Sequence, residues 1–383
     1  MVYNTPGGDE TRDGRYAEPG TGEPAGANDV ETAAEVSDQD VRAAMVNDLD
    51  ALAAENVWPD PAAKARLHFV SGKGGTGKTT VAAALALALA ASGKRVLLVE
   101  CEGRQGLAQV FDLPPLAPND TRIATSEGGG EVWALALDIE HALLEYLDMF
   151  YNLGFAGRAM KRIGAIDFVT TVAPGLRDVL ITGKIKERII ATDKQGTRLY
   201  DAVVVDSPPT GRIGSFLDVT KAMADLAKTG PIRNQSDGVV RLLHSEETVI
   251  HLVTLLEAMP ITETIEAVDE LRGKDLHVGS LIINRVSPLH LPADEIDNIA
   301  EGTIDAGRVA AALSAAGIDA SAADFAGLLT ETIEHASRLQ AQQIAKAQLD
   351  EVEIPTLELP TLGDGIDLGG LYELANLLQK AGA

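Results

Sequence analysis

The chain is poor in the residues that form crosslinks and metal clusters. It has 383 residues and one cysteine, Cys101. One thiol excludes an intrachain disulfide, a Cys-based zinc site and an iron–sulfur cluster held by a single chain. We therefore expect Cys101 to be a small buried core residue. A single cysteine, and a start without a basic and then apolar leader, lead us to expect a cytoplasmic protein.

Positive charge and long apolar runs are also scarce. The chain carries 32 Lys and Arg against 57 Asp and Glu, a formal net charge of -25. This balance argues against non-specific binding of nucleic acid, which requires a basic surface. The longest fully apolar run, residues 81–91, is too short to span a bilayer and indicates a buried helix. We expect neither a nucleic-acid partner nor stable membrane insertion.

Large apolar residues are nearly missing from the first part of the chain. Residues 1–60 contain 14 Asp and Glu against 3 Arg. A segment of this kind buries too little apolar surface to offset its ordering entropy, so we expect a disordered acidic tail over residues 1–37. Residues 38–60 are expected to form a short amphipathic helix and a linker. The helix is indicated by the spacing of Val41, Met45, Leu49 and Leu52.

Residues 61–383 alternate short β-rich runs with helical stretches. Most of the β-rich runs are nearly continuously apolar, as is typical of parallel strands covered on both faces. The expected fold class is α/β, a doubly wound, mostly parallel sheet with helices on both faces. The strand candidates are residues 67–71, 95–100, 131–137, 201–206, 248–255, 279–284 and 353–359.

The most specific motif is the glycine-rich segment 72–79, GKGGTGKT, between a strand candidate and an alanine-rich helix candidate. It fits the phosphate-loop pattern G-x-x-x-x-G-K-[ST], whose glycines let backbone N–H groups point at phosphate. We expect Lys78 to bind the β- and γ-phosphates of ATP and the Thr79 hydroxyl to bind Mg²⁺. A glycine-rich turn without a ligand is the alternative. The expected nucleotide-binding residues here are Gly72, Lys73, Gly74, Gly75, Thr76, Gly77, Lys78, Thr79 and Thr80.

A second, acidic motif completes this site. Residues 200–212, YDAVVVDSPPTGR, form an apolar strand candidate that ends in Asp206. A carboxylate at the carboxyl edge of the sheet can hold Mg²⁺ through water. The loop that follows, residues 208–211, can change shape with the γ-phosphate. A simple helix cap is the alternative role for Asp206, and the two roles can coexist.

Together these motifs resemble the ArsA/Get3 family of ATPases, whose deviant Walker A loop carries an additional early lysine. Lys73 occupies that place in GKGGTGKTT. The resemblance implies a dimer in which Lys73 reaches the partner's phosphates, like an arginine finger supplied in trans. An ordinary surface lysine is the alternative. The segment at the end of the fourth strand candidate resembles the family's second switch, with Asp206, Pro209, Thr210 and Gly211 in place.

The resemblance also implies further nucleotide contacts. The strand LIINRV resembles the one whose Asn contacts adenine in this family, which points to Asn284. The later ELPTL loop resembles the one whose proline packs on the base, which points to Pro360. Pro209 of the second switch is the remaining candidate for a nucleotide contact.

The first switch departs from the family's D-P-A-H pattern. Glu102 stands where that Asp polarises water, and Gly103, Arg104, Gln105 and Gly106 follow it. A glutamate can orient water but is one methylene longer, and placement errors near 1 Å are costly. We expect slow turnover, or a partner that does most of the hydrolysis. The expected catalytic residues are Lys73, Glu102 and Asp206, and the expected metal ligands are Thr79 and Asp206.

A helical insertion is expected over about residues 141–190. Its first part gathers aromatic residues, and an apolar stripe falls at helical spacing. In Get3 this segment builds a groove for a hydrophobic, tail-anchored client, so a similar client surface is one interpretation. The other is that the stripe packs on the sheet.

The resemblance leaves partner and pathway open. The chain has no C-x-x-C zinc clamp, which indicates a bacterial, zinc-free branch and either a homodimer or a heterodimer with an ArsA-like paralogue. One alternative is a nucleotide-dependent scaffold or positioning switch like the Min and Par proteins. A further alternative is an arsenite-efflux ATPase subunit, although Cys101 alone cannot build a thiolate site.

Overall fold

A computed structural model describes the chain over residues 56–126, 128–139, 141–142, 174–218, 231–287, 291–318, 321–362 and 365–383. The expected acidic tail and nearly all of the helix and linker over residues 38–60 lie outside this part. So does most of the insertion expected over 141–190, apart from its last helix.

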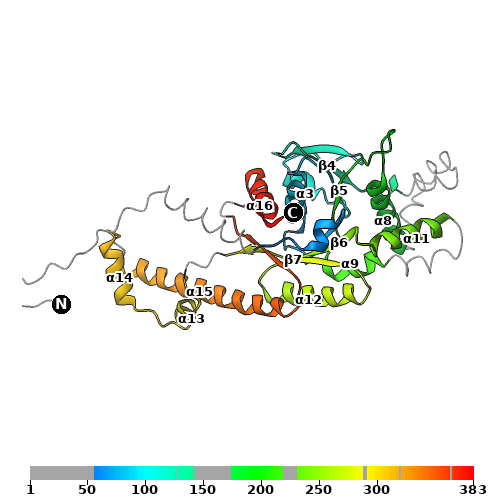
Figure 1. The fold of residues 1–383 in the computed structure, drawn as a ribbon. Helices are drawn as coiled ribbons and strands as arrows, with labels where there is room; N and C mark the ends of the chain where they lie inside the picture. Colours follow the sequence, from blue (N-terminus) through cyan, green and yellow to red (C-terminus); the bar gives the residue numbers. More distant parts are fainter. Residues whose placement is uncertain are drawn as a thin grey trace, which may run out of the picture.

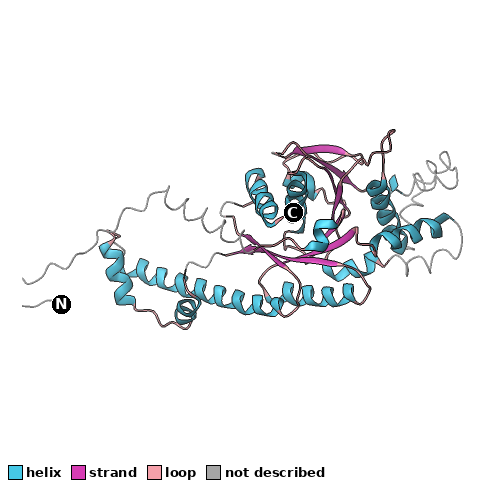
Figure 2. Cartoon of the chain, viewed as in Figure 1, coloured by secondary structure: helices cyan, strands magenta, loops and turns pink. Residues whose placement is uncertain are grey.

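One mixed sheet organises the described chain (Figures 1 and 2). It has eight strands in the order β3-β4-β2-β5-β1-β6-β7-β8. Neighbouring strands pair in parallel, except that β3 is antiparallel to β4. The strands are β1 Leu67–Gly72, β2 Arg95–Glu100, β3 Thr121–Thr125, β4 Glu131–Ala136, β5 Ala202–Asp206, β6 Thr248–Thr254, β7 Val278–Val286 and β8 Thr356–Pro360.

Helices cover both faces, and alternate residues of each strand enter one of two cores. On one face Val70, Leu98 and Val204 pack with α3 and α16, and on the other Phe69, Leu97 and Val203 pack with α8, α9, α11 and α12. The helices are α2 Asp60–Lys64, α3 Lys78–Ala90, α4 Gly106–Val110, α8 Pro174–Ile190, α9 Thr210–Leu217, α11 Pro231–Leu243, α12 Ala258–Arg272, α13 Ala293–Ala300, α14 Ala306–Ala315, α15 Ala322–Asp350 and α16 Leu368–Ala381. The expected doubly wound fold is confirmed.

The seven expected strands are present, with two differences. Strand β3 was missed because its residues, TRIAT, are half-buried or exposed and lack the apolar run of an interior strand. Strand β8 begins at Thr356 rather than at residue 353. Its expected start fails because Glu353 has a positive φ of 55° and Pro355 has no N–H to donate to a neighbouring strand.

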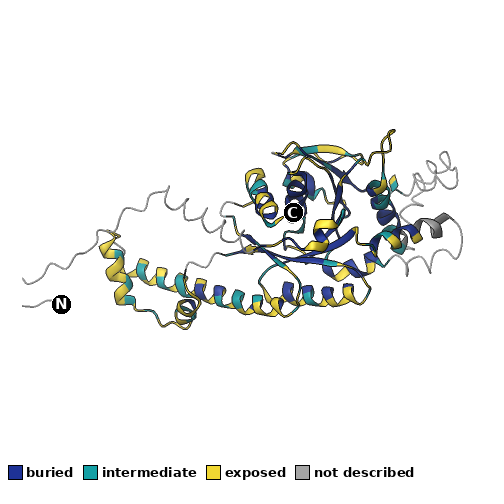
Figure 3. Ribbon diagram, viewed as in Figure 1, coloured by how far each residue is buried: buried dark blue, intermediate teal, exposed yellow. Residues whose placement is uncertain are grey.

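Helices α13, α14 and α15, which we call the helical arm, project from the sheet (Figure 1). The arm carries much exposed surface (Figure 3). Helix α14 has no buried residue, and α15 buries Ala336, Leu339, Ala345 and Leu349 over its 29 residues. Ile296 of α13 packs against the first two of these. The arm is therefore held to the body mainly through the last part of α15.

The last helix, α16, packs its apolar face on α3. Leu371, Leu374, Leu377 and Leu378 are at most 3% exposed and belong to the same core as the apolar residues of α3. The apolar stripe of α16 is thus satisfied inside the molecule. Within the part of the chain that is described, no helix has both the length and the apolarity to cross a bilayer.

Candidate nucleotide-binding site

The phosphate loop connects the end of β1 to the start of α3. Thr76 closes the loop by donating from its hydroxyl and its backbone N–H to the Lys73 carbonyl, at 2.9 and 3.3 Å. Glycine is required at more than one place in the loop. A Cβ on Gly72 would lie 2.2 Å from the Val253 carbonyl oxygen, and Gly77 has a φ of +89°. The loop is therefore built as the sequence predicts, with α3 starting at Lys78.

The hydroxyl of Thr79 and the carboxylate of Asp206 meet at the carboxyl edge of the sheet. Thr79 Oγ1 donates to Asp206 Oδ2 at 2.7 Å. Burial raises the pKa of Asp206 to about 6, against the opposing effects of Thr79 and Lys78. Burial also lowers the pKa of Lys78. Both groups are thus held in a partly dehydrated site where their electrostatic interactions are strong.

This pair suits Mg²⁺. A hydroxyl and a carboxylate are the hard oxygen ligands that Mg²⁺ prefers. Asp206 is only 8% exposed, and burial disfavours its charged form, so a bound cation would offset that cost. Thr79 and Asp206, predicted as metal ligands, are brought together by the adjacent strands β1 and β5.

A pocket of about 350 Å³ opens over the loop. Its lining unites the phosphate loop with the first and second switches. The lining residues are Gly74, Gly75, Gly77, Lys78, Thr79, Glu100, Glu102, Arg104, Gly106, Gln109 and Asp206. Glu102 Oε2 lies 3.6 Å from Arg104 Nε, and 78% of the Arg104 side chain is exposed. The candidate water-orienting carboxylate therefore faces the same pocket as Lys78 and Asp206.

Glu100 is a site residue that the sequence analysis missed. It stands beside Asp206 in the register of β2 and β5, and both side chains point to the α3 face of the sheet. Its Oε2 accepts from the Leu107 N–H at 3.2 Å, and its buried Oε1 has no hydrogen-bond partner in the described chain. Glu100 thereby fixes α4 of the first switch. A charged residue at the end of an otherwise apolar strand was the available indication.

Lys73 points elsewhere. Its Nζ lies 2.7 Å from Glu263 Oε1 on α12, and Glu263 Oε2 accepts from Thr210 Oγ1 at 3.2 Å. Lys73 is not among the lining residues of the pocket, so within the described chain it contacts a helix rather than the site of Lys78. Glu263 was not a candidate in the sequence analysis, because 190 residues separate it from the loop.

The remaining nucleotide candidates, Asn284, Pro360 and Pro209, are not among the lining residues of the pocket. Asn284 is 6% exposed and donates from Nδ2 to the Thr76 carbonyl at 2.8 Å, while its Oδ1 accepts from the Arg285 N–H. Pro360 is buried at the end of β8, beside Val286. Pro209 precedes the first residue of α9. Their contacts with adenine or phosphate stay predictions.

Cys101 is 1% exposed, as expected of a core residue, and burial raises the pKa of its thiol. It follows Glu100 at the end of β2, and its N–H donates to the Asp206 carbonyl at 3.3 Å. In the described part of the chain, no three or more His, Cys, Asp or Glu side chains are grouped as a metal site.

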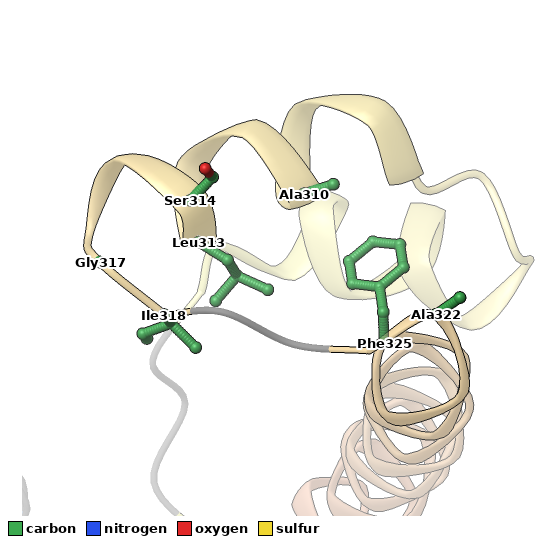
Figure 4. A pocket seen from close by; sticks show the side chains of 7 residues that line it. All are labelled: Ala310, Leu313, Ser314, Gly317, Ile318, Ala322 and Phe325. Carbon is green, nitrogen blue, oxygen red and sulfur yellow. The ribbon is translucent and has the colours of Figure 1, made fainter.

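A second hollow of about 590 Å³ lies in the helical arm, between α14 and the start of α15 (Figure 4). Leu313, Ile318 and Phe325 line it, and 53% of Ile318 is exposed. The sequence analysis placed its candidate client surface in residues 141–190, most of which lie outside the described residues. The apolar surface of the arm was not anticipated.

Comparison with known proteins agrees with this geometry. Residues 65–243 match the family model described as Anion-transporting ATPase. The chain is 61% identical to the ATPase BagA of Mycobacterium tuberculosis over 325 residues, which cover 85% of this chain and 96% of that protein.

More distant relatives carry both family names. The ATPase GET3 of Kluyveromyces lactis is 26% identical over 255 residues, covering 58% of this chain and 72% of that protein. The arsenical pump-driving ATPase of Acidiphilium multivorum is 28% identical over 238 residues, which cover 57% of this chain and 39% of that protein. The sequence similarity and the convergence of loop and switches in one pocket lead to one conclusion: the chain belongs to the ArsA/Get3 family of ATPases.

Proposed function

We propose that this ATPase works as a nucleotide-bridged dimer that couples Mg²⁺-dependent ATP hydrolysis to a change of shape. The observation that carries the proposal is the division of the two loop lysines. Lys78 lines the pocket, whereas Lys73, five residues earlier, lies outside it and partly exposed. A lysine so placed is available to a nucleotide on another subunit.

Five side chains have a task in this scheme. Lys78 and the loop N–H groups hold the β- and γ-phosphates, and Thr79 and Asp206 hold Mg²⁺. Bound ATP with Mg²⁺ supplies the phosphoanhydride bond and the cation that neutralises its charge. Glu102 orients the attacking water. Lys73 of the partner subunit stabilises the charge that develops on the γ-phosphoryl group, a contribution on the order of 10³–10⁵ in rate for comparable groups.

The altered first switch bears on the expected rate of ATP hydrolysis and on the identity of the partner subunit. Glu102 replaces a shorter carboxylate, and Arg104 beside it is mostly exposed. We therefore infer slow intrinsic turnover, with a heterodimer containing an ArsA-like paralogue as one form and a homodimer as the other. Copurification of this chain with a paralogue that has D-P-A in its first switch supports the heterodimer.

The shape change is proposed to act on a hydrophobic client, bound through residues 141–190. The second switch is well connected for this purpose. Ser71 Oγ donates to the Pro208 carbonyl at 2.6 Å, and α8, the last helix of that insertion, packs against α9. A movement of the second switch with the γ-phosphate is thereby passed toward the insertion.

The two alternatives receive less support. A positioning switch needs a free amphipathic or basic segment for lipid or DNA, and the apolar face of α16 is already buried on α3. An arsenite-efflux subunit needs several thiolates, and Cys101, the chain's one cysteine, lies in the core.

The lysine pair tests the proposal directly. Lys78→Ala is expected to abolish ATP binding, because it removes the phosphate-binding cation of the pocket. Lys73→Ala is expected to retain ATP binding and to lose hydrolysis by at least about 100-fold, because its target is the partner's nucleotide. Fluorescent-nucleotide titration and phosphate release measure the two quantities. Full-rate hydrolysis by the Lys73 variant, or by a strict monomer, refutes the proposal.

A further inference from the structure

The Glu263 carboxylate bridges two parts of the machinery that are distant in sequence. One oxygen holds the Lys73 ammonium at 2.7 Å, and the other accepts from the Thr210 hydroxyl at 3.2 Å. Thr210 is 2% exposed and begins α9, directly after the prolines of the second switch. A single side chain on α12 therefore contacts both the early lysine of the phosphate loop and the start of α9.

The two partners of Glu263 differ in their exposure to water. The ion pair is open to water, with 28% of the Lys73 and 32% of the Glu263 side chain exposed. Ion pairs exposed to this degree are weak. Thr210 is 2% exposed and is held in place as the first residue of α9. Lys73 can therefore exchange Glu263 for another anion, whereas Thr210 stays beside Glu263.

We propose that Glu263 is a positioning residue that holds Lys73 within its own protomer and releases it to the phosphates of a nucleotide on a partner subunit. The triphosphate offers more negative charge than one carboxylate and replaces Glu263 as the counter-ion of Lys73. Glu263 keeps its contact with Thr210 and loses the Lys73 ammonium. Formation of the dimer thereby changes the charge beside Thr210, at the start of α9 and next to the second switch. The inference rests on the proposed dimeric function, and its holding step can be tested in one protomer.

The holding step is tested by acetylation of the nucleotide-free full-length chain, with mass spectrometry of the modified lysines. In Glu263→Gln, the neutral amide no longer pairs with the ammonium, so Lys73 is expected to react at least about twice as fast. Lys78 is expected to keep its rate. Glu266→Gln removes the same charge from an exposed position on α12 and is the matched control. Equal Lys73 rates in the wild type and Glu263→Gln overturn the holding step.

The release step is tested by sedimentation of the full-length chain with ATP and Mg²⁺. Glu263→Gln is expected to lower the dimer dissociation constant by up to about fivefold for each Lys73 released, which is the upper range of one exposed ion pair, or up to about 25-fold for a homodimer that releases two. The effect must vanish in a Lys73→Ala background and be absent in Glu266→Gln.

A higher dimer dissociation constant in Glu263→Gln than in the wild type overturns the release step. The same fall of that constant in the Lys73→Ala background also overturns it. If the wild-type chain alone forms no dimer with ATP, the homodimer form of the proposed function fails and the release step fails with it. The acetylation result then still decides whether Glu263 holds Lys73.

Discussion

Three carboxylates line the pocket over the phosphate loop in the described part of the chain, and they are not equivalent. Asp206 is hydrogen-bonded to Thr79, Glu100 is hydrogen-bonded to the backbone of α4, and Glu102 lies at the pocket wall near the exposed Arg104. The charges of Glu100 and Glu102 both add to the raised pKa of Asp206. Glu102 is therefore the carboxylate with the most freedom to engage a water molecule.

Glu102→Gln is expected to slow ATP hydrolysis by at least about tenfold, because an amide accepts a proton far less readily than a carboxylate does. ATP binding is expected to change less than threefold, since Lys78 and Thr79 remain. Single-turnover phosphate release and nucleotide titration separate the two effects. Glu102→Asp is the informative control, because it restores the family's shorter carboxylate. Unchanged hydrolysis in Glu102→Gln assigns the water-orienting role to another group.

At the scale of elements, the phosphate loop depends on a buttress from β7. Asn284 donates to the Thr76 carbonyl, and a Cβ on Gly77 would lie 2.4 Å from the Asn284 amide nitrogen. Gly77 also has a φ of +89°, which strains any other residue. The loop is thus shaped by its own glycines and by a strand more than 200 residues later in the chain.

Gly77→Ala is expected to lower the free energy of unfolding by about 1–3 kcal/mol, because the methyl group meets Asn284 and the backbone is strained. Gly74→Ala is the matched control in the same loop, where an added Cβ meets nothing within 4 Å and φ is not positive. Its expected change is within about 0.5 kcal/mol. Denaturant unfolding without nucleotide measures both, and equal losses contradict the buttress.

At the scale of the whole molecule, buried polar side chains form a row across the neighbouring strands β1, β6 and β7. His68 Nδ1 lies 3.2 Å from His251 Nε2, and His251 Nδ1 lies 2.7 Å from Ser280 Oγ. The Trp58 ring packs 5.0 Å from the ring of His251, measured between centroids. Burial lowers the pKa of His68 to about 4, and it lowers the pKa of His251 well below the usual range. Both imidazoles are neutral in the folded protein near neutral pH.

The chain is therefore expected to lose stability in mild acid. Between pH 6.5 and 4, His68 and His251 become protonated in the unfolded chain but stay neutral in the folded protein. The free energy of unfolding therefore falls as pH falls. Each buried histidine contributes up to roughly 1.4 kcal/mol per pH unit in that range. His68→Gln is expected to flatten the pH dependence of the melting temperature, whereas exposed His335→Gln is expected to leave it unchanged. Parallel curves for His68→Gln and the wild type contradict this account.

Much of the molecule follows from local sequence pattern. The phosphate loop, the apolar strands and the acidic end of β5 are each encoded within a few neighbouring residues, because loop geometry and strand burial depend on short-range composition. Strand β3 escaped prediction because an edge strand need not be apolar. The strand order places Lys78, Thr79 and Asp206 together. The sequence predicted Asp206 at the carboxyl edge of the sheet but gave no strand order.

By itself, the sequence determined the fold class and the phosphate loop, and it singled out Glu102 after β2 and Asp206 at the end of β5, since these depend on residue type and spacing. Only the tertiary structure decided which distant groups meet: Lys73 with Glu263, Gly77 with Asn284, and His68 with His251. These contacts join residues far apart in the chain through the packing of separate elements. No local pattern encodes such packing, because it arises when the whole sheet closes around its cores.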